Sequence, residues 1–175
     1  MFNDSMLADP SGRSEFFGDT WEWYGGAWHR ASTIGPTARC HFAMAYDPVH
    51  ENVVLVGGYG PRGGDSKTWT WDGKWRAVSV GAPADRSSPR MVWSDTEKTI
   101  LLFGGESGDN RASDTWAWNG SKWAQIAQVG PPGRTVHGLA WDDTRKGMIL
   151  YGGASGNDVL DDTWTFGAGA WKRLS

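Results

Sequence analysis

The chain has 175 residues, a net charge of −3 at pH 7 and 21% charged residues. This balanced charge, without a run of Lys or Arg, excludes nucleic-acid binding through a strong positive field. No apolar run reaches the roughly 18 residues that a membrane helix needs, so we expect no membrane-spanning segment. The single cysteine, Cys40, excludes a disulfide within this chain and any metal site built from several cysteines.

The first residues, MFNDSMLADPSG, have neither the basic start nor the apolar stretch of a signal peptide, and the sequence leaves the cellular compartment open. Residues 1–18 permit two interpretations. SMLADPSGRSEFFGD can be aligned with FAMAYDPVHENVVLVGG at 42–58, which predicts a degenerate half of a repeat. Alternatively, the segment is a loop left from a truncated repeat.

From residue 19 onward one phrase recurs. It reads DTWEWYGGAW at 19–28, KTWTWDGKW at 67–75, DTWAWNGSKW at 114–123 and DTWTFGAGAW at 162–171. Its first tryptophans are separated by 48, 47 and 48 residues. A fixed period of this size is typical of a repeat architecture.

Residues 19–32 supply two strands of a first, partial repeat, and complete repeats follow at 39–80, 86–128 and 134–175. In the last repeat we expect strands at 136–142, 148–153, 162–166 and 170–174, with a loop at 154–161. No segment has helical periodicity, so the sequence predicts an all-β chain. We treat residues 1–175 as one domain, divided into 1–32, 33–80, 81–128 and 129–175.

Four short antiparallel strands cannot bury both faces of their sheet alone, whereas repeats stacked face to face can. Tryptophan buries more area than most residues and suits such packing. We therefore expect the repeated tryptophans to pack between neighbouring sheets. They are Trp21, Trp28, Trp69, Trp75, Trp116, Trp123, Trp164 and Trp171.

Each complete repeat also has a glycine pair after its second strand: Gly57 and Gly58, Gly104 and Gly105, and Gly152 and Gly153. Glycine accepts a positive φ and allows close backbone approach, which a crowded strand end requires. With the polar loop, the Thr-Trp and the final Trp, these pairs resemble the Kelch-repeat family, in its bacterial form. The resemblance implies a Kelch-type β-propeller segment with three complete four-stranded blades and a partial or degenerate N-terminal blade.

Kelch-like propellers usually close with six or seven blades, so the resemblance implies a fragment or an association of chains. We expect a homo-oligomer, a dimer that completes a ring of seven or eight blades. Such closure would cover the apolar faces of the terminal blades.

Three arginines form a second repeated column: Arg39, Arg86 and Arg134 each lie 18 residues before the first glycine of a pair. In a propeller they would share one rim with the loops after the glycine pairs. Guanidinium groups bind carboxylates in a bidentate manner, so this rim is a candidate site for an acidic peptide or a glycan. The alternative is that each arginine pairs with a loop carboxylate or caps backbone carbonyls.

Catalytic signals are weak, and we expect no catalytic residue, metal or cofactor. His137 occupies a column with Phe42 and Pro89 and is predicted to face the central channel, as a binding residue or as a satisfied structural histidine. The favoured function is a non-catalytic interaction module. The alternatives are a sugar-active enzyme of the Kelch superfamily and a purely structural, self-associating repeat cassette.

Overall fold

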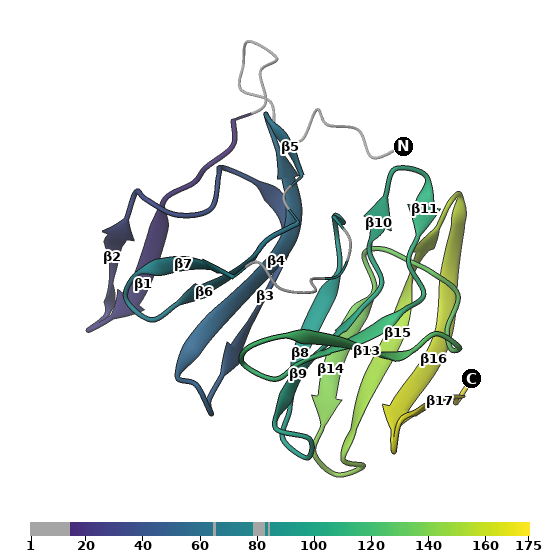
Figure 1. Cartoon of the computed structure of the whole chain (residues 1–175). Coiled ribbons are helices and arrows are strands. Elements are labelled where there is room, and N and C mark those ends of the chain that lie inside the picture. Colours follow the sequence, from purple (N-terminus) through teal and green to yellow (C-terminus); the bar gives the residue numbers. More distant parts are fainter. Residues whose placement is uncertain (1–14, 65, 79–82, 84) are drawn as a thin grey trace.

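The computed structural model describes residues 15–64, 66–78, 83 and 85–175. These residues contain no helix, and their strands pair antiparallel, which confirms the all-β class (Figure 1). No helix in this part of the chain is long and apolar enough to cross a membrane. Residues 1–14 lie outside the described ranges, so the two interpretations of the N-terminal segment stay predictions.

The strands form one hairpin and three larger sheets. The hairpin sheet pairs β1 (Thr20–Tyr24) with β2 (Ala27–Ser32). Sheet I orders β3 (Cys40–Asp47), β4 (Asn52–Gly60), β6 (Thr68–Trp71) and β7 (Trp75–Val78), with β5 (Gly63–Gly64) against the end of β4. Sheet II orders β8 (Arg90–Ser94), β9 (Thr99–Phe103), β12 (Thr115–Trp118) and β13 (Trp123–Ala127). Sheet III orders β14 (Gly138–Asp142), β15 (Gly147–Ser155), β16 (Asp158–Gly167) and β17 (Ala170–Arg173).

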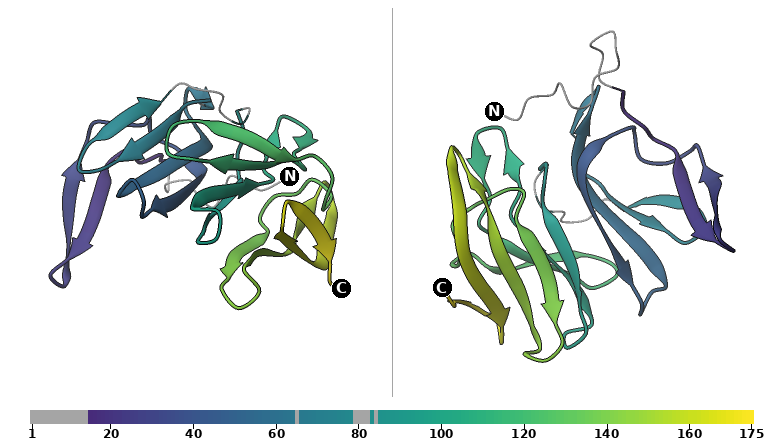
Figure 2. Two further views of the ribbon diagram at one scale, coloured as in Figure 1. Left: turned by 60° about the horizontal axis from the view of Figure 1, so that its bottom comes forward. Right: turned by 180° about the vertical axis from the view of Figure 1, so that it is seen from behind.

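The sheets follow one another along an arc, with the hairpin sheet at one end and sheet III at the other (Figure 2). Their first strands approach one another, since β8 contacts both β3 and β14. No closed sheet forms among the described strands. Each repeat is therefore one antiparallel sheet, and neighbouring repeats meet face to face.

The apolar core lies between the sheets. Val54 and Val56 of sheet I are buried against four residues of sheet II, which are Ile100, Leu102, Trp118 and Trp123. Leu101 of sheet II is buried against Met148 and Phe166 of sheet III. Alternation along each strand sends its residues to opposite faces, so β9 of sheet II contributes to the junctions on both of its sides.

The loop predicted at 154–161 is shorter than expected, and that prediction is wrong. Strands β15 and β16 continue past the glycines and pair Ala154 with Val159 and Ser155 with Asp158. In sheet II the equivalent segment after the glycine pair forms a separate hairpin, in which β10 (Glu106–Ser107) pairs with β11 (Asn110–Arg111). A glycine and one polar residue suffice to reverse the chain, and the extended flanks then satisfy their backbone groups by pairing.

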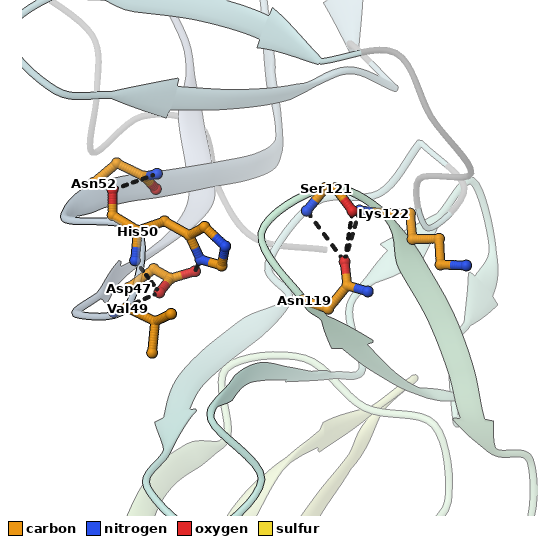
Figure 3. Close-up of polar contacts among 7 residues, drawn as sticks. All are labelled: Asp47, Val49, His50, Asn52, Asn119, Ser121 and Lys122. Carbon is orange, nitrogen blue, oxygen red and sulfur yellow. Dashed lines mark hydrogen bonds and ion pairs between the residues drawn. The ribbon is translucent and has the colours of Figure 1, made fainter.

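At the other end of the sheets, tight turns are held by side-chain acceptors (Figure 3). Asp47 accepts hydrogen bonds from the backbone N–H groups of Val49 and His50 and contacts the His50 ring at 2.9 Å. Asn119 accepts from the N–H groups of Ser121 and Lys122, at 3.1 and 3.0 Å. The Asn-Gly-Ser sequence at 119–121 thus forms a tight turn, in which Asn and Gly are typical residues.

Candidate functional site at the strand-end rim

The glycine pairs bring the backbones of neighbouring sheets together. All six glycines have positive φ, between 61° and 105°, as the sequence predicts. The N–H of Gly58 donates to the carbonyl of Arg86, and that of Gly105 to the carbonyl of Arg134, both at 2.9 Å. A Cβ on Gly104 would lie 2.7 Å from the Arg134 oxygen. Glycine is required here because this hydrogen bond leaves no room for a side chain.

The three arginines of the repeated column are buried, with exposed fractions of 7% for Arg39, 4% for Arg86 and 0% for Arg134. Each Nη1 donates to the carbonyl of the glycine 18 residues later, at 2.9, 3.1 and 2.9 Å respectively. This constant bond explains the constant spacing of the column. The side chain of each arginine joins the first strand to the second within its own sheet.

Two of the three arginines also form bidentate ion pairs. Arg86 donates to both oxygens of Asp114 at 2.7 and 3.0 Å, and Arg134 to both oxygens of Asp162 at 2.5 and 3.0 Å. These aspartates open the repeated Asp-Thr-Trp phrase. Hydrogen bonds from Arg134 hold the pKa of Asp162 down at about 2 against the opposing effect of its burial. Burial acts to raise the pKa of Asp114, but the hydrogen bonds from Arg86 and Trp116 outweigh it and the pKa is lowered.

Sheet I departs from this pattern, because Lys67 stands where Asp114 and Asp162 stand in the other sheets. Arg39 instead donates to the carbonyl and the hydroxyl of Thr37, at 2.9 and 3.0 Å. The structure thus places all three arginines beneath the rim. The contacts are those of the alternative interpretation, in which the arginines pair with carboxylates and cap carbonyls.

His137 does not face an open channel, contrary to the prediction. Its exposed fraction is 2%, and its ring lies edge-on to Phe103 of sheet II, with centroids 5.6 Å apart. Neither ring nitrogen has a hydrogen-bond partner among the described residues. Burial, together with the charges of Arg90 and Arg134, lowers the pKa of His137 to about 3.

Above the arginines the rim is hollowed into a cavity of about 430 Å³, here called the rim cavity. All three larger repeats contribute to it, from the start of β3, from the segments before β8 and β14, and from the residues that follow the glycine pairs. Its lining consists of His41, Tyr59, Ser87, Ser88, Glu106, Gly108, Asp109, Arg111, Thr135, Val136, Ala154 and Gly156.

Three lining residues share an unusual backbone conformation. His41, Ser88 and Val136 have φ values of 56°, 55° and 49°. Each lies two residues after an arginine of the column, so the conformation repeats with the fold. Left-handed φ is costly for a residue with a Cβ, and most of all for a β-branched residue such as Val136. The residue types differ from repeat to repeat, which is why no motif in the sequence indicated them.

The rim cavity combines an aromatic surface with polar groups. The His41 ring stacks on Tyr59, with centroids 5.3 Å apart and planes 9° from parallel. Glu106 forms an ion pair with Arg111 at 3.2 Å and accepts a hydrogen bond from Ser87 at 3.3 Å. Cys40 is half-buried, and its Sγ lies 3.0 Å from Nδ1 of His41. Among the described residues no group of three or more His, Cys, Asp or Glu side chains is arranged to hold a metal ion.

The sequence matches no protein-family model, and no curated protein matches it. Its relation to Kelch repeats therefore stays a prediction, based on the repeated phrase, the glycine pairs and the arginine column.

Proposed function

We propose that this chain is a non-catalytic interaction module, a Kelch-type β-propeller segment that binds a glycan in the rim cavity. The observation that supports this most directly is the convergence of three left-handed, non-glycine residues, His41, Ser88 and Val136, on one cavity. Each costs roughly 1–2 kcal/mol in backbone energy. Strained residues of this kind cluster at binding sites, where the surrounding structure fixes them in place.

The buried arginines support this proposal indirectly. The carbonyl or the side chain of each arginine is hydrogen-bonded to a glycine pair, which fixes the backbone at the start of the first strand of the sheet. The residue two positions later, His41, Ser88 or Val136, therefore projects from a fixed backbone. Rigid positioning lowers the entropy lost when a ligand binds. The arginines therefore act as positioning residues, and the adjacent rim residues contact the ligand.

The lining favours a neutral, hydroxyl-rich ligand over an acidic peptide. The guanidinium groups of the arginine column are satisfied within the fold, and Arg111 of the lining is paired with Glu106, whereas Asp109 adds a further negative charge to the cavity. Carboxylates accept hydrogen bonds from sugar hydroxyls, and the hydroxyls of serine and threonine both donate to them and accept from them. The exposed face of the stacked His41 and Tyr59 pair offers a flat aromatic surface to a sugar ring.

A glycan panel with the purified chain tests the proposal, followed by calorimetric titration of the glycans that bind. We expect Tyr59→Ala and Asp109→Asn each to weaken binding by about tenfold, which corresponds to about 1.4 kcal/mol. Asp143→Asn is the matched control, because Asp143 lies in an exposed turn remote from the rim cavity and pairs with a surface lysine, Lys146. Binding that survives both cavity substitutions would contradict the proposed site, and selective binding of peptides in place of glycans would contradict the ligand class.

A further inference from the structure

The junctions between consecutive sheets repeat one hydrogen bond. In each, the indole N–H of a tryptophan on the outermost strand donates to the hydroxyl of the threonine that opens β1, β6 or β12 in the preceding sheet. The pairs are Trp75 with Thr20 at 2.7 Å, Trp123 with Thr68 at 2.8 Å and Trp171 with Thr115 at 2.8 Å. A sheet thus has two different faces, one that supplies tryptophans and one that receives them.

The receiving face is apolar and becomes buried when the next sheet covers it. In sheet II, Phe103 lies on this face opposite Thr115 and contacts the Trp171 ring edge-on, with centroids 5.1 Å apart. Its exposed fraction is 0%, and that of the equivalent Val56 in sheet I is 3%. The face of one sheet that carries the tryptophan and the receiving face of the preceding sheet are therefore complementary surfaces.

One supplying face is left open, on the hairpin sheet. The rings of Trp23 and Trp28 meet edge-on at 5.4 Å, the same centroid distance as Trp118 and Trp123 in sheet II. Trp118 and Trp123 are 0% and 5% exposed, whereas Trp23 and Trp28 are 58% and 63% exposed. The hairpin already holds its two indoles in the paired arrangement of a junction.

One receiving face is also left open, on sheet III. Thr163 and Tyr151 pair across β16 and β15 as Thr115 and Phe103 do in sheet II. Tyr151 is 58% exposed. The Thr163 hydroxyl accepts from Ser175 at 2.9 Å, and a hydroxyl oxygen has a second lone pair for an indole N–H.

We propose that these two open faces bind each other between two copies of the chain, with Trp28 Nε1 of one copy donating to Thr163 Oγ1 of the other. The occupant is a second copy because the chain itself carries both halves of a junction that it forms three times internally. The contact is head-to-tail, and such contacts form a ring when the rotation between copies closes. The proposal is the smallest such ring, a dimer with two junctions. This inference is independent of the proposed glycan site.

Light scattering coupled to size exclusion, at micromolar concentration, tests the junction. We expect twice the chain mass of 19.2 kDa for the unmodified protein and 19.2 kDa for Trp28→Glu and for Tyr151→Glu. Trp28→Phe keeps an aromatic ring but loses the indole N–H, and should raise the dissociation constant about tenfold, the effect of one lost hydrogen bond. Tyr24→Ala is the matched control, because Tyr24 lies on the same hairpin with 57% exposure but, by strand alternation, on the opposite face from Trp23.

Mixing the two charged variants distinguishes this junction from any other. Trp28→Glu retains an intact receiving face and Tyr151→Glu an intact supplying face, so an equimolar mixture should recover dimers with one intact junction. A 19.2 kDa mass for the unmodified chain, or an oligomer unaffected by both substitutions, would overturn the proposal. Circular dichroism of each variant shows that a lost dimer is not a lost fold.

Discussion

At the scale of single residues, the Arg–Asp pairs illustrate why a buried charge must be matched. Arg134 has no exposed surface, and the bidentate bond to Asp162 compensates for removing its charge from water. Such a pair adds little over an apolar substitute, but breaking it leaves an uncompensated charge in the interior. The pair therefore makes the fold sensitive to the loss of either partner.

Asp162→Asn should lower the free energy of unfolding by about 3–5 kcal/mol, since Arg134 keeps its charge and loses its counter-ion. Urea denaturation measures this difference. Asp143→Asn removes an exposed pair and should change stability by less than about 0.5 kcal/mol. Equal effects of the two substitutions would contradict the role assigned to the buried pair.

The buried His137 should make the stability of the fold depend on pH. Its pKa is about 3 in the folded chain and about 6.5 when unfolded, so below pH 6.5 only the unfolded state takes up the proton. Stability should therefore fall as the pH falls from 6.5 toward 3, by about 1.4 kcal/mol per pH unit.

His137→Phe, which introduces the residue that Phe42 supplies at the same repeat position, should flatten this slope. Urea midpoints at pH 7, 6 and 5 provide the measurement. Asp162 contributes in a different window, because its lowered pKa stabilises the fold above the ordinary value of 3.8 and this contribution is lost toward pH 2. A slope between pH 6.5 and 5 that persists in the variant would show that another group causes it.

At the scale of elements, the glycine pair fixes how closely two sheets approach. Gly104 and Gly108 both have positive φ, but a Cβ on Gly104 would meet Arg134 at 2.7 Å and one on Gly108 would meet nothing within 4 Å. Substitution of Gly108 therefore tests backbone strain alone, whereas substitution of Gly104 tests backbone strain together with steric exclusion.

Gly108→Ala should cost about 1 kcal/mol, from the left-handed conformation alone. Gly104→Ala should cost at least about 2 kcal/mol more, because the sheets must separate or lose the Gly105–Arg134 hydrogen bond. Thermal and urea unfolding of both variants give the comparison. Similar losses for the two would mean that sheet II and sheet III can shift apart at little cost.

At the scale of the whole molecule, stability arises between repeats. The two buried clusters each combine residues of adjacent sheets, and sheet II contributes to both. In a short repeat array with strong interfaces, unfolding one unit exposes the core of the next, so the units unfold together.

We therefore expect tryptophan fluorescence and far-ultraviolet circular dichroism to report the same unfolding midpoint. Leu101→Ala, at the junction of sheets II and III, should lower both midpoints together, with a loss of about 2–5 kcal/mol. Two separated transitions would contradict this coupling and indicate that the sheets unfold independently.

The sequence alone determined the repeat, the all-β class, the four strands of each complete repeat and the glycine pairs, because period and turn chemistry are local. It also identified the arginine column, but the partners Asp114 and Asp162 lie 28 residues away and only the folded sheet brings them together. The rim cavity was missed because His41, Ser88 and Val136 share a backbone conformation and no residue type. Only the tertiary structure decided three further features: the strand bounds near the glycines, the burial of His137 and the two open faces. All three depend on how neighbouring sheets pack, and contacts between sheets exist only in the folded chain.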